Sequence, residues 1–233
     1  MNDIESRLLA IKEQIAAHAR QANRAPDEIK LLAVSKTKPV EAIQAAYQAG
    51  QRLFGESYVQ EAITKIQLLN NAPEYAGIEW HFIGPLQSNK TRPVAEHFDW
   101  VHSVDREKIA QRLNEQRPAG LPALNICIQV NISGEQTKSG MTPDEVFGLA
   151  GIISHFPRLK LRGLMAIAEN TDDMHVVRDN FLQMQALFNR LKNLYPSVDT
   201  LSMGMTDDMP AAISCGSTMV RIGTAIFGSR EYK

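Results

Sequence analysis

The sequence has few cysteines, almost no net charge and no long apolar run, and each shortage excludes a class of protein. Its 233 residues include two cysteines, Cys127 and Cys215, far apart and without a histidine nearby at metal-ligand spacing. A disulfide framework or a metal site is therefore not expected, and reduced thiols fit a cytoplasmic protein. Cys127 lies in an apolar run, where core packing is its expected role.

The charge balance excludes two kinds of partner. The chain carries 25 Lys and Arg against 26 Asp and Glu, which gives a net charge of −1. Nucleic acid and anionic membranes both require a basic surface, so neither is expected as a partner. No apolar run is long enough to span a bilayer, and the first residues lack the basic and apolar segments of a secretory signal.

What the chain does contain is a regular alternation of strand and helix patterns. An apolar stripe at Ile4, Leu8, Ile11 and Ile15 predicts a helix before the first strand. Eight strands are then expected, at 31–35, 51–55, 80–84, 99–103, 125–130, 161–167, 199–203 and 218–222. No linker or repeat divides them. The pattern predicts a (β/α)₈ barrel with an extra N-terminal helix, built as a single domain over residues 1–233.

Two helix starts have clear signals. Pro39 precedes an apolar pattern that stops at Gly50, which predicts a helix just after the first strand. Thr142-Pro143-Asp144-Glu145 has the form of a capping box with proline in the first turn, and it should open the helix before the sixth strand.

Lys36 follows the first strand directly. Barrels place their chemistry at the carboxyl ends of the strands, and an amine at such a position can form a Schiff base with an aldehyde. Lysines in such turns are usually solvated surface groups, and Lys38 is an equally good candidate from position alone.

The loops after the seventh and eighth strands are candidates for a phosphate site. Ser202 and Gly204 follow the seventh strand, and Gly223 and Thr224 follow the eighth. Glycines allow a phosphate to approach the backbone, hydroxyls can donate to it, and barrels often bind phosphate at these two loops. Ordinary turn geometry would explain either loop alone. Both loops together with a strand-end lysine favour a phosphorylated aldehyde as the ligand.

Seven motifs in order show a resemblance to a known family. They are Val34-Ser-Lys36-Thr-Lys, Phe54-Gly-Glu56, His81-Phe-Ile-Gly84, Leu86-Gln-Ser-Asn-Lys90, Arg162-Gly-Leu-Met-Ala166, Leu201-Ser-Met-Gly204-Met and Met219-Val-Arg221-Ile-Gly-Thr224. With these motifs the chain resembles the YggS/PROSC-type pyridoxal phosphate homeostasis proteins. The resemblance implies a barrel like the N-terminal domain of alanine racemase.

The same resemblance implies the roles of individual residues. Pyridoxal 5'-phosphate would be held as a Schiff base on Lys36 rather than on Lys38, with Arg221 facing the pyridine nitrogen. Ser202, Gly204, Gly223 and Thr224 would lie around the phosphate. Relatives commonly have Asn where this chain has Ser57, so Ser57 is not assigned to the site.

The resemblance favours a carrier over an enzyme. An arginine beside the pyridine nitrogen disfavours its protonation and weakens the electron sink, although alanine racemases tolerate it. The racemases also take a tyrosine base from a separate domain that this chain is expected to lack, and Tyr232, close to the terminus, is a weak substitute. The expected function is intracellular buffering of pyridoxal phosphate and its supply to apo-enzymes, which affects amino-acid and keto-acid balance, by a monomer without catalytic residues.

Two enzymatic alternatives stay open. One is an amino-acid racemase or related enzyme with an unidentified base such as His81, although a hydrogen-bonded histidine inside the barrel explains that residue more simply. The other is an aldolase in which Lys36 reacts directly with a sugar phosphate. Glu135 and Lys138 lie in a polar loop after the fifth strand that could meet a ligand or partner, although a solvated loop is the simpler interpretation and Lys138 is assigned no cofactor bond.

Overall fold

The computed structural model describes residues 3–135, 139–168 and 171–229. Within them, eight parallel strands follow one another around a closed barrel in chain order, and the last strand pairs with the first. The strands are β1 Lys30–Val34, β2 Leu53–Glu56, β3 Glu79–Phe82, β4 Trp100–Val104, β5 Leu124–Gln129, β6 Leu159–Met165, β7 Thr200–Ser202 and β8 Met219–Ile222. The predicted barrel is confirmed, and each expected strand overlaps an observed one.

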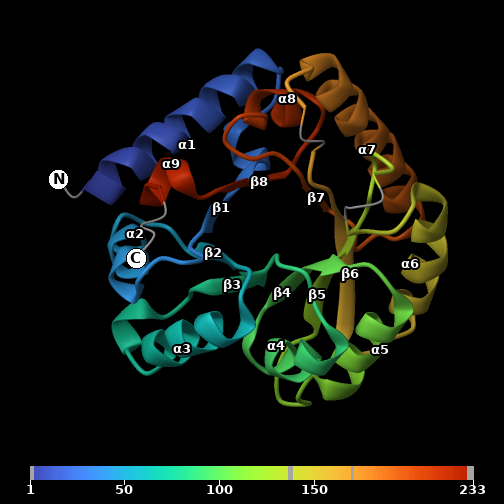
Figure 1. Ribbon diagram of the computed structural model, residues 1–233, viewed down its shortest axis with the longest axis horizontal. Helices are drawn as coiled ribbons and strands as arrows, with labels where there is room; N and C mark the ends of the chain where they lie inside the picture. The colour runs from blue at the N-terminus through green and yellow to red at the C-terminus, as the bar shows by residue number, and fades with distance from the viewer. Residues whose placement is uncertain (1–2, 136–138, 169–170, 230–233) are drawn as a thin grey trace.

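Helices surround this barrel (Figure 1). The α-helices are α1 Asp3–Gln21, α2 Val40–Gln48, α3 Val59–Asn70, α4 Thr91–His97, α5 Glu107–Gln116, α6 Val146–Ser154, α7 Met174–Leu194, α8 Met209–Ser214 and α9 Thr224–Phe227. The described residues also contain four 3₁₀ turns between these elements: η1 Pro26–Glu28, η2 Pro73–Tyr75, η3 Ser88–Lys90 and η4 Pro143–Glu145. No described helix is both long enough and apolar enough to cross a membrane.

The capping box is present, one turn earlier than the α-helix itself. The Glu145 carboxylate accepts bonds from the Thr142 backbone N–H at 2.8 Å and from the Thr142 hydroxyl at 2.7 Å. The box opens η4, and α6 continues from Val146. The proline therefore starts a 3₁₀ turn that leads into the α-helix, as its fixed φ favours at a helix start.

Helix α1 lies outside the barrel beside the place where β8 meets β1 (Figure 1). Its buried face consists of Leu8, Ile11, Ile15 and Ala19, and it packs against α2, α8 and α9. Just beyond it, the Arg24 guanidinium donates to the carbonyls of residues 213 and 217, at 2.9 Å and 2.7 Å. The predicted N-terminal helix thus holds the first and last parts of the barrel together.

Two groups of buried side chains fill the molecule. A continuous apolar cluster occupies the layer between strands and helices. A separate small cluster of Trp100, Cys127 and Met165 adjoins the barrel interior, where the His81 ring stacks on Trp100 with 5.1 Å between centroids. Cys127 is completely buried, as expected from its apolar run. The barrel interior therefore combines apolar residues with polar ones.

Candidate functional site

Lys36 lies in the turn between β1 and α2, at the carboxyl end of the barrel. Its side chain is half-buried. The next residue, Thr37, has a φ of 64°, a left-handed conformation that costs a β-branched residue energy and is kept only where the surroundings enforce it. Lys38 is directed elsewhere, because its ammonium donates to the Ser229 carbonyl at 2.6 Å.

A group of charged side chains braces the residues on either side of Lys36. The buried Glu56 carboxylate, at the end of β2, accepts bonds from the Ser35 hydroxyl at 2.7 Å and from the Lys65 ammonium at 2.9 Å. Lys65 also donates to the Ser35 carbonyl at 2.9 Å and to Glu61. Glu61 in turn accepts from the Thr37 backbone N–H at 2.6 Å. We define Ser35, Thr37, Glu56, Glu61 and Lys65 as the lysine brace.

Burial raises the pKa of Glu56. Lys65 and the Ser35 hydroxyl oppose this increase because they stabilise the charged carboxylate. One oxygen of that carboxylate, Oε2, is buried and has no hydrogen-bond partner among the described residues. Burying these polar and charged groups therefore costs free energy, and the arrangement of the lysine brace depends on the ammonium of Lys65.

The two predicted phosphate loops lie at the carboxyl ends of β7 and β8. Gly204 has a φ of +99°, and a Cβ there would lie 2.5 Å from the Cβ of Ala212, so only glycine fits. Gly223 precedes α9, and a Cβ there would lie 3.2 Å from the Val34 carbonyl at the end of β1. Thr224 is exposed. Gly223 thus brings the turn after β8 close to the strand that leads to Lys36, and Gly204 brings the turn after β7 close to α8.

Arg221 is almost fully buried near the end of β8. One nitrogen of its guanidinium, Nη1, donates to the Ser202 hydroxyl, and the other, Nη2, donates to the Ala166 carbonyl, both at 2.9 Å. Burial lowers the pKa of Arg221 to about 10, which still leaves it protonated at neutral pH. Both of these acceptors are neutral, so this buried cation is suited to a ligand atom that accepts a hydrogen bond.

Ser202 faces the barrel interior. Its hydroxyl lies between Arg221 and the Nδ1 atom of His102, 3.0 Å away. In the neighbouring turn, the Met205 backbone N–H donates to Asp208 at 2.5 Å. Both donors are therefore used within the protein. The Gly223–Thr224 turn is the better placed of the two loops for a phosphate, and the phosphate contact of Ser202 stays a prediction.

The hydrogen-bond chain continues through His81, which is buried and hydrogen-bonded inside the barrel as expected, and through His102 and Glu79, which were not predicted. His102 Nε2 lies 2.9 Å from His81 Nδ1, and His81 Nε2 lies 2.9 Å from a carboxylate oxygen of Glu79. Burial lowers the pKa of both histidines, that of His102 well below 6.5, with the neighbouring His81 and Arg221 adding to the effect. The only sequence signal was the presence of polar residues inside otherwise apolar strands.

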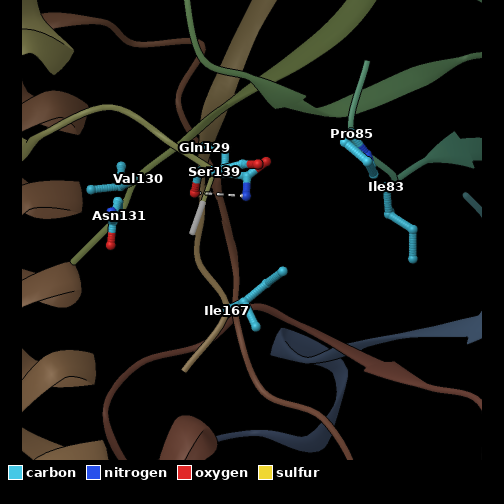
Figure 2. A pocket seen from close by; sticks show the side chains of 7 residues that line it. All are labelled: Ile83, Pro85, Gln129, Val130, Asn131, Ser139 and Ile167. Atoms are coloured by element: carbon cyan, nitrogen blue, oxygen red, sulfur yellow. Dashed lines mark hydrogen bonds between the residues drawn. The ribbon is translucent and has the colours of Figure 1, made fainter. Parts of the chain in front are cut away.

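A cavity of about 150 Å³ opens beside the ends of β3, β5 and β6 (Figure 2). The described residues that line it are all uncharged: Ile83, Pro85, Gln129, Val130, Asn131, Ser139 and Ile167. The Gln129 amide donates to the Ser139 carbonyl at 3.2 Å, which turns this polar group toward the protein (Figure 2).

Other predicted positions have different outcomes. Lys138 and Tyr232 lie outside the described residues. Glu135 is half-buried, and its carbonyl accepts from the Asn131 amide at 2.8 Å. The Ser57 backbone packs tightly against Gly84. Within the described ranges, no group of three or more His, Cys, Asp or Glu side chains is arranged to hold a metal ion.

Comparison with known proteins first gives the class. The family model described as alanine racemase, N-terminal domain, matches residues 7–231. A structure from Bifidobacterium adolescentis is 34% identical, covers 97% of this chain and 94% of its own, and superimposes with a TM-score of 0.90. The chain is thus a barrel protein of the alanine racemase N-terminal type.

Closer relatives define the family. The pyridoxal phosphate homeostasis protein of Pasteurella multocida is 58% identical over 231 residues, covering 98% of each chain. PipY of Synechococcus elongatus, solved with PLP bound, is 36% identical, covers 97% of this chain and 100% of its own, and has a TM-score of 0.82. This chain belongs to the family of pyridoxal phosphate homeostasis proteins.

Proposed function

We propose that this chain binds pyridoxal 5'-phosphate reversibly at the barrel mouth, with Lys36 as the point of covalent attachment, and acts in intracellular pyridoxal phosphate homeostasis. The observation that carries the proposal is the buried Arg221 guanidinium, held by neutral acceptors at the end of β8, next to the strand that leads to Lys36. The relatives named as homeostasis proteins and the PLP-bound PipY structure support it.

The residues present fit this cofactor. The braced turn fixes the backbone on both sides of Lys36, and Lys38 is bonded away from it. Arg221 is suited to donate to the pyridine nitrogen. The Gly223–Thr224 turn, with the Gly204 turn beside it, would receive the phosphate, since the first N–H groups of a helix have no acceptor within the helix. When bound, the cofactor supplies an aldehyde that reacts with amines and a ring that accepts electrons.

We further propose that the protein holds the cofactor without catalysing a reaction. His81, the candidate base, is fully buried, and both of its ring nitrogens are engaged, by His102 and Glu79. Donation by Arg221 would disfavour protonation of the pyridine nitrogen and so leave the ring a weak electron acceptor. The described lining of the neighbouring cavity offers no charged group for a substrate carboxylate. In this proposal residues 1–233 act as one domain and a monomer, in the cytoplasm.

The attachment is tested by visible absorbance of the protein with pyridoxal phosphate, followed by borohydride reduction and peptide mapping. Wild-type protein and Lys38→Ala should show the absorbance of lysine-bound cofactor, mapped to Lys36, and Lys36→Ala should lose it. Cofactor mapped mainly to another lysine would overturn the assignment of Lys36, and no absorbance change in wild type would overturn the proposed binding.

The carrier role is tested in two assays. Loaded protein mixed with an apo-enzyme that requires pyridoxal phosphate should activate it, and activation no faster than the release of free cofactor would contradict direct supply. Amino acids incubated with loaded protein in deuterium oxide should keep their α-hydrogen. Lys36-dependent deuterium incorporation would favour the racemase alternative, and cleavage of a sugar phosphate by cofactor-free protein would favour the aldolase.

A further inference from the structure

The barrel interior contains a chain of hydrogen bonds that joins its two ends. It runs from Arg221 through Ser202, His102 and His81 to Glu79, with heavy-atom distances of 2.9, 3.0, 2.9 and 2.9 Å. Arg221 lies near the carboxyl end of β8, whereas Glu79 is the first residue of β3. In Figure 1 β7 and β8 lie across the barrel from β3 and β4, so the chain crosses the interior.

The order of donors in this hydrogen-bond chain follows from its two ends. A guanidinium only donates, so the Ser202 oxygen must accept from Arg221. An ionised carboxylate only accepts, so the His81 proton sits on Nε2 and is donated to Glu79, and Nδ1 of the neutral His81 ring accepts from His102. The His102 proton therefore sits on Nε2, and His102 Nδ1 accepts from the Ser202 hydroxyl. Every bond points from Arg221 toward Glu79, and both rings are neutral.

The electrostatic surroundings agree with this order. Burial lowers the pKa of both histidines and so favours their neutral forms. The bond from His81 lowers the pKa of Glu79, whose side chain is 40% exposed, so the acceptor at the end of the chain is an ionised carboxylate. Asp99 and Lys30 also act on His81, with opposite signs. Asp208 and Cys127 act on Arg221 and partly oppose the lowering of its pKa.

Glu79 fixes both ring tautomers. Without its carboxylate, the His81 proton is equally well placed on Nδ1, where it would donate to His102 Nε2. The His102 proton would then point at Ser202. The Ser202 oxygen would face two donors, and its own proton would lose its acceptor. Arg221 would lose a well-oriented partner, although Glu79 does not touch it.

We propose that His102 and His81 are positioning residues through which the Glu79 carboxylate, at the amino end of the barrel, orients Ser202 and Arg221 for the cofactor. This inference rests on the proposed function, because it assigns Arg221 to the pyridine nitrogen. It makes cofactor affinity depend on a carboxylate outside the binding site. Buried chains of this kind couple their members more strongly than exposed hydrogen bonds do.

The first test uses cofactor-free protein labelled with ¹⁵N in its histidines. The ring nitrogen shifts should show His81 and His102 neutral, with the proton on Nε2 in each. In Glu79→Met these shifts should move toward the other tautomer at both rings, and Glu79→Gln, which keeps an acceptor oxygen, should restore the wild-type pattern. A wild-type His102 with its proton on Nδ1 would overturn the inference.

The second test measures the dissociation constant of pyridoxal phosphate by absorbance. Glu79→Met should weaken binding about threefold to tenfold, which lies within the range usual for coupling through a network, and Glu79→Gln should weaken it less than about twofold. Asp199→Asn is the matched control. Asp199 lies just before β7 at the same end of the barrel, and it pairs with Arg162, which is not a member of the hydrogen-bond chain. It should bind like wild type.

Equal affinity in Glu79→Met and wild type would overturn the inference. An equal loss of affinity in Asp199→Asn would also overturn it, because removal of any carboxylate at the amino end of the barrel would then weaken binding. If wild-type protein bound no cofactor, the proposed function would be overturned, and the predicted effect on affinity with it. The ring tautomers of the cofactor-free protein would still decide the order of the hydrogen bonds. Ser202→Ala, which breaks the hydrogen-bond chain at its other end, should leave the His102 proton on Nε2, because Glu79 still fixes it through His81.

Discussion

Replacing Lys65 by methionine should destabilise the protein through the lysine brace. The Lys65 side chain is 7% exposed, and the Glu56 carboxylate that it neutralises is fully buried. Methionine keeps the length and the apolar stem but removes three hydrogen bonds, to Glu56, Glu61 and the Ser35 carbonyl. A buried charge left without its partner costs about 3–5 kcal/mol, so Lys65→Met should lose roughly that much free energy of unfolding.

Urea unfolding at pH 7.5 measures the loss. The double variant Lys65→Met with Glu56→Gln should recover most of it, because the amide still accepts from the Ser35 hydroxyl and no charge is left buried. Lys108→Met, at an exposed position on α5, is the matched control and should stay within about 0.5 kcal/mol of wild type.

The pH dependence gives a further check. The pKa of Glu56 is already raised by burial, and loss of Lys65 removes the largest opposing effect. Folded Lys65→Met should therefore bind a proton on Glu56 as the pH falls, and its deficit relative to wild type should shrink between pH 7.5 and 5.5. A loss of less than about 1 kcal/mol, or a double variant no more stable than the single one, would refute the stabilising role of the lysine brace.

Three further predictions concern the barrel interior and its packing. Burial holds the pKa of His102 well below 6.5, so the stability that the neutral His102 ring contributes is complete above pH 6.5 and falls as the pH drops. In urea unfolding, the stability advantage of wild type over His102→Gln should shrink by about 1.4 kcal/mol from pH 7.5 to 5.5. A constant difference would contradict this. Gly163→Ala places a Cβ against the Thr200 carbonyl and should lower the free energy of unfolding by more than about 2 kcal/mol. Gly148→Ala, in α6 with open space around it, should raise the free energy of unfolding by up to about 1 kcal/mol. Similar changes of melting temperature in the two variants would contradict the tight packing at Gly163. Burial raises the pKa of Cys127, so a thiol reagent should label it in urea but not in native protein, and rapid native labelling would contradict its burial.

The barrel could be predicted from the sequence because each strand carries its own signal. Buried parallel strands are apolar runs bounded by turns, and this pattern is local. The boundaries shifted by up to two residues, as at 161–167, observed as Leu159–Met165. Strand ends depend on pairing with neighbours, which a single segment does not encode.

The site could be predicted only in part. Lys36 and Lys38 are equivalent by position, and the direction of the Lys38 side chain is set by its bond to the carbonyl of Ser229, 191 positions away in the chain. Ser202 is predicted as a phosphate ligand because it lies at the end of a strand close to a glycine, and this stays a prediction. Its contact with His102 spans 100 positions, so no local pattern could show that its hydroxyl is already used.

The position of α1 has a consequence for how the chain reaches this fold during synthesis. The Arg24 contact just beyond α1 spans 189 positions, and at ribosomal rates its partner in α8 emerges roughly 10–40 s later. Throughout that delay the apolar face of Leu8, Ile11 and Ile15 lacks its partners in α8 and α9. Helix α1 can therefore complete its docking only after α8 and α9 have been synthesised, and we expect closure of the barrel between β8 and β1 to be the slow folding step that is exposed to aggregation.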